Sequence, residues 1–170
     1  MNSKDEPPSQ ANDRFILVDA TSQKLYCYQR DVLIDTYLVS TAKNGLGERL
    51  GSGCTPRGWH AIYAVLGLNA PLNSVFVSRQ STDAIYSAAF AQANPEKDWI
   101  LTRILQLDGL EPGRNRGGDV DTLSRYIYIH GTSDEVALGT PVSKGCIRMS
   151  NTAVIDLAQW VSVGTRVCVQ

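Results

Sequence analysis

Short runs of β-branched and aromatic residues, separated by Gly, Asn, Ser and Asp, constrain the fold of this chain most. Such runs are typical of β-strands, because these side chains pack well on a pleated surface. The segments with this pattern are Phe15–Val18, Leu25–Gln29, Val32–Ser40, Trp59–Leu66, Ser74–Ser78, Ile100–Leu107, Arg125–Ile129 and Thr165–Val169. Because few helices interrupt them, they predict a mainly β domain, a sandwich or an open barrel, rather than alternating βαβ units.

Two segments have helical patterns instead. Thr82–Ala93 is rich in alanine, begins with a threonine that can cap a first turn and stops before Asn94-Pro95. Asn151–Val161 places apolar side chains at i, i+3, i+4 and i+7, the spacing of one helix face. Two glycine-rich segments, Lys43–Gly53 and Asp108–Val120, predict long loops.

Length and composition indicate one domain without a strongly charged surface. The chain has 170 residues, 43% of them hydrophobic, which is enough for one core. Residues 1–13 are polar and predict a flexible tail before a domain over 14–170. The net charge of −1 gives no overall field that would attract nucleic acid. The longest apolar stretch, Ala61–Leu66, is far short of the ~20 residues that span a bilayer, so we expect no membrane insertion.

The start of the chain and its cysteines bear on the compartment. The first residues lack the apolar core of about 7 to 15 residues that a secretory signal needs, which predicts a cytoplasmic protein. A periplasmic location is the alternative if an export signal has been removed. The four cysteines are Cys27, Cys54, Cys146 and Cys168. They fit free thiols, although an even count also permits two disulfides. With His60 and His130 as the only histidines and no CxxC pair, we expect no metal and no other cofactor.

One histidine and one cysteine have the features of catalytic residues. His130 follows a predicted strand, and Cys146 follows in the sequence S-K-G-C-I-R just before a predicted helix. A nearby base, cations such as Lys144 and Arg148, and a helix N-terminus all favour the thiolate that a nucleophilic cysteine needs. Gly145 leaves room for a substrate beside the sulfur. A lone cysteine is more often a small buried hydrophobic residue, but a core cysteine rarely lies in a turn between lysine and arginine.

These residues belong to a longer pattern. H-G-T at 130–132, followed by S-K-G-C-I-R-M-S-N at 143–151, resembles the signature of the YkuD family, the L,D-transpeptidase catalytic domain. Segments 40–48, 55–60 and 109–132 are similar to the same family. One residue departs from it, because Lys144 stands where the family usually has a second histidine. The resemblance implies a YkuD-like β-sandwich or open barrel over residues 14–170.

The resemblance also implies the catalytic roles. Cys146 would be the nucleophile and His130 its general base. The backbone carbonyl of Gly131 would be the third member, so no carboxylate is required. The backbone N–H groups of Gly145 and Cys146 would form the oxyanion hole.

The same resemblance implies substrate-binding roles for Arg148, Lys144, Ser143 and Thr132. Arg148 and Ser143 would hold the site or a substrate carboxylate, because a guanidinium fork suits carboxylates. For Arg148, bracing the loop through backbone carbonyls is an equal alternative. Thr132 either contacts substrate or caps the loop.

The family implies a reaction on cell-wall peptides. Its members attack the L-centre carbonyl of the third residue in a peptidoglycan tetrapeptide stem and expel the terminal D-alanine. An amine that resolves the thioester gives transpeptidation, and water gives L,D-carboxypeptidation. Short members without an export signal are cytoplasmic L,D-carboxypeptidases of wall recycling. We therefore expect hydrolysis of soluble muropeptides or nucleotide-linked precursors, and acylation by carbapenems.

Three alternatives to this reading stay open: a periplasmic L,D-transpeptidase, a non-catalytic wall-binding module and a general cysteine peptidase. Segments 82–93 and 108–120 are candidates for a lid that controls the access of an acceptor. Cys54 is a candidate redox-sensitive thiol. Cys27 and Cys168 are expected in the core, and His60 is expected to be structural.

Overall fold

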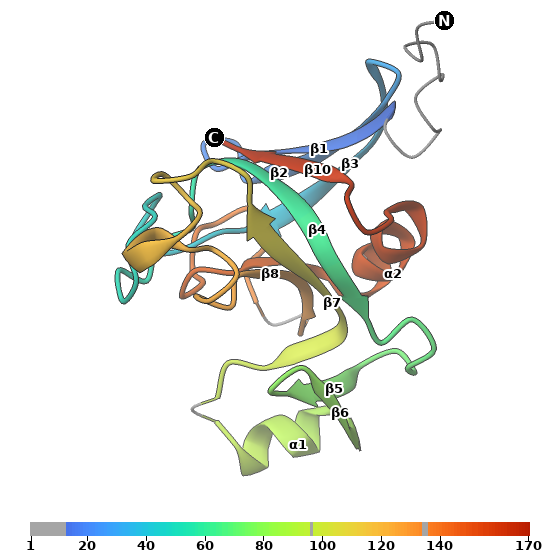
Figure 1. Cartoon of the computed structure of the whole chain (residues 1–170). Coiled ribbons are helices and arrows are strands. Elements are labelled where there is room, and N and C mark those ends of the chain that lie inside the picture. Colours follow the sequence, from blue (N-terminus) through green and yellow to red (C-terminus); the bar gives the residue numbers. More distant parts are fainter. Residues whose placement is uncertain (1–12, 96, 134–135) are drawn as a thin grey trace, which may run out of the picture.

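The computed structural model describes residues 13–95, 97–133 and 136–170 (Figure 1). Apart from Asp13, the expected tail lies outside these ranges. The described residues form the strands β1 (Arg14–Asp19), β2 (Lys24–Gln29), β3 (Val32–Ser40), β4 (Gly58–Leu66), β5 (Ser74–Val77), β6 (Gln80–Ile85), β7 (Ile100–Gly109), β8 (Tyr128–Thr132), β9 (Ile147–Ser150) and β10 (Arg166–Val169), with the helices α1 (Ala88–Ala93) and α2 (Asn151–Trp160). None of the helices in this part of the chain is long and apolar enough to cross a bilayer.

Eight of the strands close into a mixed barrel. Their order is β4-β10-β1-β2-β3-β9-β8-β7, and β7 pairs with β4 to complete the ring. The pairs β1–β10 and β8–β9 are parallel, and the other pairs in the ring are antiparallel. The prediction of a mainly β fold with two short helices is confirmed, and the β4–β7 pairing makes the barrel closed rather than open.

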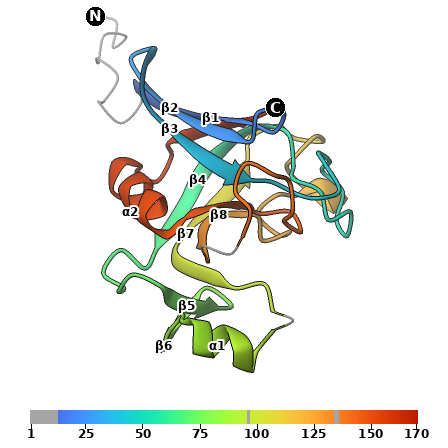
Figure 2. The same cartoon turned by 180° about the vertical axis from the view of Figure 1, so that it is seen from behind.

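The remaining small elements gather at one end of the barrel. β5 pairs with β7 and forms a hairpin with β6, and α1 follows this hairpin. In both views these three elements lie away from the end that carries β1, β2 and the C-terminus (Figures 1 and 2). β7 pairs both with barrel strands and with β5, so it connects the barrel to the small lobe formed by β5, β6 and α1. Most of its residues are buried as a result.

The interior of the barrel is filled by alternate side chains of its strands together with one face of α2. Val154, Leu157 and Ala158 of α2 are buried, as the expected helical spacing requires. Ser150 caps this helix by accepting a hydrogen bond from the Ala153 N–H. The helix packs against β7, β8 and β9, so it supports the strands that carry the candidate site.

The helix predicted over Thr82–Ala93 is wrong in its first half. Residues up to Ile85 form β6, because they pair with β5 in an antiparallel ladder. The Thr82 hydroxyl donates to the Val75 carbonyl instead of capping a helix. The helix begins only at Ala88, where the Ser87 hydroxyl accepts from the Phe90 N–H.

The strand predicted over Arg125–Ile129 is shifted along the chain. Tyr126 has a φ of 57°, a left-handed conformation that ends the preceding turn, so β8 begins at Tyr128 and continues to Thr132. His130 therefore lies inside a strand rather than at its end. Cys146 does not directly precede a helix either, because β9 lies between it and α2.

Candidate active site

The parallel pairing of β8 and β9 brings His130 and Cys146 into one site. Ile129 pairs with Ile147 and His130 with Arg148, so Cys146 enters the sheet beside Tyr128. The Tyr128 N–H donates to the Cys146 sulfur at 3.3 Å. Tyr128 and His130 lie two residues apart on one strand, so their side chains share a face. The β8–β9 pairing thus brings the histidine and the thiol onto neighbouring chain segments.

Among the described residues, the ring of His130 has one hydrogen-bond partner, a backbone carbonyl. Its side chain is 2% exposed, and Nδ1–H donates to the Gly131 carbonyl at 2.7 Å. Because a carbonyl can only accept, Nδ1 carries the proton and Nε2 has a free lone pair. Burial lowers the pKa of His130 below its usual range, since the imidazolium form loses its hydration. At neutral pH the ring is therefore a neutral base.

Burial acts on Cys146 in the opposite direction. Burial raises the pKa of the thiol to about 11, and the charge of Asp98 adds to the rise. The Tyr128 N–H and the guanidinium groups of Arg148 and Arg125 lower it in part. In the resting site the thiol is therefore protonated and donates to the Tyr126 carbonyl at 3.5 Å, and the neutral imidazole of His130 lies on the adjoining strand β8. This pair can transfer a proton from sulfur to nitrogen as the sulfur attacks an electrophile.

The loop before Cys146 is fixed by two buried hydroxyl groups. Ser143 Oγ donates to the Cys146 carbonyl at 2.6 Å and accepts from the Gly145 N–H at 3.2 Å. Thr55 Oγ1 donates to the Gly145 carbonyl at 2.9 Å and accepts from the Ala42 N–H at 3.0 Å. Both hydroxyl groups use a donor and an acceptor, so the loop is held to the segment before β4 without any charge.

The same contacts distinguish the two N–H groups expected in an oxyanion hole. The Gly145 N–H already donates to Ser143, whereas the Cys146 N–H has no acceptor in the described part of the chain. Gly145 has a φ of 139°, which favours glycine. A Cβ at Gly145 would also lie 3.2 Å from the Ile127 side chain.

Of the other residues expected to bind substrate, only Lys144 is exposed. Thr132 and Ser143 are each 2% exposed, and Arg148 is 6% exposed. The guanidinium of Arg148 donates to the Asp98 carboxylate, and its Nε has no partner within the described ranges. The charge of Arg148 is therefore neutralised inside the protein.

A cavity of about 410 Å³ lies against the loop before Cys146, which contributes Lys144 to its lining. It is lined by residues of the β5–β6 turn, the segment before β7 and the nucleophile loop: Phe76, Val77, Ser78, Lys97, Asp98, Trp99, Ile100 and Lys144. Phe76 and Ile100 belong to the same apolar cluster as Cys146, and Lys144 lies two residues before it, so the cavity lies near the cysteine although Cys146 does not line it. Apart from Lys144, sequence analysis missed this lining, because no local motif marks side chains that only the β5–β7 pairing brings together.

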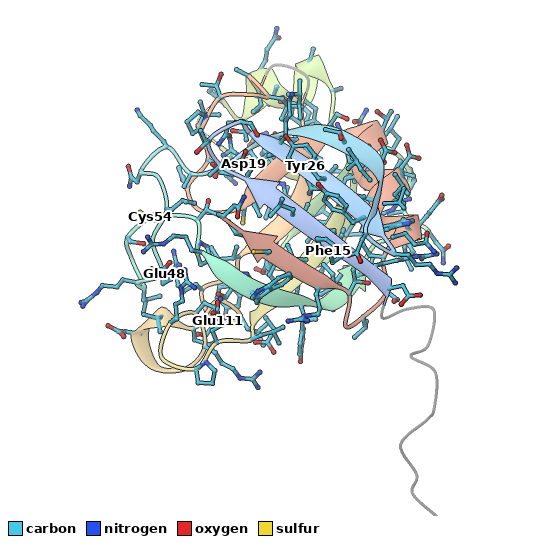
Figure 3. The ribbon with its side chains drawn as sticks, turned by 90° about the horizontal axis from the view of Figure 1, so that it is seen from above. Phe15, Asp19, Tyr26, Glu48, Cys54 and Glu111 are labelled. Carbon is cyan, nitrogen blue, oxygen red and sulfur yellow. The ribbon has the colours of Figure 1, made fainter. Side chains whose placement is uncertain are left out.

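The loop 108–120 lies elsewhere and lines no part of this cavity. Its Glu111 carboxylate accepts from the Trp59 N–H, and its Asp119 carbonyl accepts from the Leu50 N–H. In Figure 3, Glu111 lies on the same side of the molecule as Glu48 and Cys54. The cavity is instead bordered by the β5–β6 turn, near the segment 82–93, which is the other lid candidate.

The remaining cysteines and His60 lie outside the cavity. All four cysteines are free thiols, Cys27 is buried and Cys168 is half-buried. Cys54 is half-buried, and its carbonyl accepts from Arg125 at 2.8 Å. His60 is fully buried, with a partner for each ring nitrogen. Among the described residues, no three His, Cys, Asp or Glu side chains gather as a metal site would require.

Comparison with known proteins places these features in a family. Residues 13–169 match the YkuD family, described as the L,D-transpeptidase catalytic domain. Two Bacillus subtilis proteins provisionally named as L,D-transpeptidases are similar in part. YqjB is 50% identical over 51% of this chain and 59% of its own length, and YkuD is 49% identical over 33% of this chain and 37% of its own length. The matches therefore span less than two thirds of these relatives.

Solved structures share the fold at low sequence identity. An L,D-transpeptidase from Xylanimonas cellulosilytica superposes with a TM-score of 0.59 at 21% identity, covering 96% of this chain and 63% of that one. An L,D-transpeptidase from Mycobacterium smegmatis gives a TM-score of 0.57 at 21% identity, covering 93% of this chain and 58% of that one. With the family match over nearly its whole length, this chain belongs to the YkuD family of L,D-transpeptidase catalytic domains.

Proposed function

We propose that this protein is a cysteine-dependent L,D-carboxypeptidase that removes the terminal D-alanine from peptidoglycan tetrapeptide stems, on soluble muropeptides or nucleotide-linked precursors. The observation that carries the proposal is the placement of Cys146 beside the strand of His130, whose ring is oriented through Nδ1 and has a free Nε2. Family membership supplies the reaction class, an acyl transfer through a cysteine thioester.

The first half of the reaction forms the thioester. Cys146 Sγ attacks the carbonyl carbon of the third residue, and His130 Nε2 accepts the thiol proton. The Cys146 N–H donates to the oxyanion, and the Gly145 N–H joins it by exchanging its bond to Ser143 for one to the oxyanion. The C–N bond then breaks, and His130 returns the proton to the departing amine of D-alanine.

The second half consumes a water molecule. His130 Nε2 accepts a proton from water as the oxygen attacks the thioester carbon. The C–S bond breaks, the proton passes from His130 to the sulfur, and the tripeptide leaves with a new carboxylate.

Burial divides the remaining site residues into two groups. Ser143, Thr132 and Arg148 are buried and act as positioning residues for the loop and for β9. The carboxylate of Asp98 keeps Arg148 from competing for substrate. Lys144 is exposed at the cavity and contacts the substrate.

The test is mass spectrometry of the purified protein with a soluble tetrapeptide muropeptide, with and without an acceptor amine. We expect loss of D-alanine and formation of the tripeptide in both samples, and no reaction with Cys146→Ala. An acceptor-linked product would identify a transpeptidase instead. No reaction in any sample would favour a non-catalytic wall-binding module.

Acylation by a carbapenem gives an independent readout. One solved relative is in complex with imipenem, and L,D-transpeptidase 3 from Mycobacterium tuberculosis carries a faropenem-derived adduct. We expect imipenem to add its mass to the wild-type protein and not to Cys146→Ala. An adduct that persists in Cys146→Ala would assign the nucleophile to another residue.

A further inference from the structure

We propose that Lys97 and Lys144 together bind a carboxylate of the substrate, so that the enzyme selects peptides with a free carboxylate next to the scissile bond over amidated ones. This inference rests on the proposed function and specifies which peptides the site accepts. It adds Lys97, a residue that no sequence motif indicated, and it assigns a chemical partner to the cavity beside Cys146.

The charges in the cavity do not cancel. Among the described residues, the charged side chains that line it are those of Lys97, Asp98 and Lys144. The Asp98 carboxylate is already paired with the guanidinium of Arg148, whose side chain is only 7% exposed. Neither lysine has an ion pair within the described residues. Two ammonium groups are therefore left to face the cavity, although the whole chain has a net charge of −1.

The walls of the cavity strengthen an ionic contact made there. Phe76, Trp99 and Ile100 form an apolar lining, which lowers the local dielectric constant compared with an open surface. Lys97 Nζ lies 5.2 Å from the centroid of the Trp99 ring, so the ring holds this ammonium group at the wall. The Trp99 Nε1–H is buried without an acceptor in the described part of the chain, and a bound carboxylate oxygen would supply one after a small shift of the ring.

The positions of Lys97 and Lys144 indicate which part of a bound peptide their ammonium groups would contact. Lys144 lies two residues before Cys146, and Ile100 and Phe76 pack with Cys146 in one cluster. A group held by both lysines therefore belongs to one of the two residues that flank the scissile bond. Two carboxylates fit this position: the terminal carboxylate of the leaving D-alanine and a side-chain carboxylate on the third residue.

The experiment crosses lysine variants with amidated peptides. The enzymes are the wild type, Lys97→Gln, Lys144→Gln and the double variant, with Lys24→Gln as the control, because Lys24 is an exposed lysine of β2 that does not line the cavity. The peptides are a tetrapeptide with both carboxylates free, its C-terminal amide and its third-residue side-chain amide. Steady-state kinetics gives kcat and KM, and calorimetry on a Cys146→Ala background gives Kd without turnover.

We expect the double variant to raise KM and Kd for the free peptide roughly tenfold to hundredfold, as loss of hydrogen bonds between charged groups does, with kcat changed less. For the wild type, one of the two amides should raise KM and Kd by the same factor, and that amide identifies the recognised carboxylate. The double variant should bind this amide and the free peptide with equal Kd. Lys24→Gln should behave as wild type.

Two outcomes would overturn the inference: equal effects of the lysine variants on all three peptides, or no effect on any. A different outcome would contradict the proposed function without contradicting the carboxylate site. If the wild type releases no D-alanine from any peptide while calorimetry still shows lysine-dependent selection, the reaction is wrong and the carboxylate site stands.

Discussion

The two histidines of this chain have nearly the same surroundings and differ at one nitrogen. His60 and His130 both lie buried inside strands, and in each the Nδ1 contacts a backbone carbonyl, of Gly58 at 3.0 Å and of Gly131 at 2.7 Å. Burial lowers the pKa of both rings, to about 4 for His60. The difference is at Nε2: in His60 it is 3.0 Å from the Thr122 hydroxyl, whereas in His130 it has no partner within the described ranges.

This difference shows that burial and a lowered pKa do not by themselves mark a base. Both nitrogens of His60 are occupied, so its ring only connects β4 to the segment before β8. His130 has one nitrogen fixed, and within the described ranges the other has no partner, which leaves it available for the general-base role proposed above. The comparison predicts that the two residues fail in different ways when they are replaced.

The largest expected effect is on activity. We expect His130→Gln to lower kcat for D-alanine release about 10²–10⁴-fold, because a glutamine cannot accept the thiol proton. His60→Gln should retain kcat within about threefold, since general-base catalysis does not involve it. Kinetics with active-site titration by imipenem measures both. Equal losses in the two variants would remove the distinction between the histidines.

The next largest effect is on stability. Here we expect replacement of His60 to cost more than replacement of His130, the reverse of the effect on activity. His60→Ala should lower the free energy of unfolding by roughly 1–3 kcal/mol, because the buried Gly58 carbonyl and Thr122 hydroxyl lose their partner. His130→Ala should cost less, since only one hydrogen bond, to Gly131, is lost. Urea unfolding followed by circular dichroism gives both values, with Thr122→Val as the matched control for the His60 contact. A larger loss for His130 would contradict the comparison.

The site and the fold differ in how much of each the sequence predicts. Cys146, His130 and Ser143 are predicted from short motifs at 130–132 and 143–151, whereas the role of Thr55, which holds the same loop from far away in sequence, is not predicted. The strand β6 is missed because the alanine-rich residues 88–93 favour a helix, which the prediction extends back to Thr82, whereas the pairing with β5 makes Thr82–Ile85 a strand. The cavity lining is missed for the same reason, because Lys97 and Phe76 meet through long-range sheet pairing.

The lowered pKa of His130 also determines how the activity depends on pH. A histidine acts as a base only when it is neutral, and the lowered pKa of His130 keeps it neutral below its usual value of 6.5. We therefore expect kcat/KM to fall only at pH values below 6.5 as the pH decreases. The raised pKa of the Cys146 thiol predicts that its alkylation by iodoacetamide in the free enzyme keeps increasing toward pH 11. A plateau of alkylation near pH 7 would indicate a preformed thiolate instead.

The smallest expected effect comes from Ser143. It tests whether catalysis by His130 requires the loop before Cys146 to be held in place. Ser143→Ala removes the hydroxyl that donates to the Cys146 carbonyl and accepts from the Gly145 N–H. We expect kcat to fall roughly tenfold, because about 1.4 kcal/mol of loop positioning is lost, with KM nearly unchanged. Ser143→Thr keeps the hydroxyl and should restore much of the rate, and Ser124→Ala, an exposed serine, is the control. If Ser143→Ala keeps the full kcat, the hydrogen bond from His130 to Gly131 is sufficient to align the base. The Ser143 contacts would then not contribute to positioning the Cys146 sulfur.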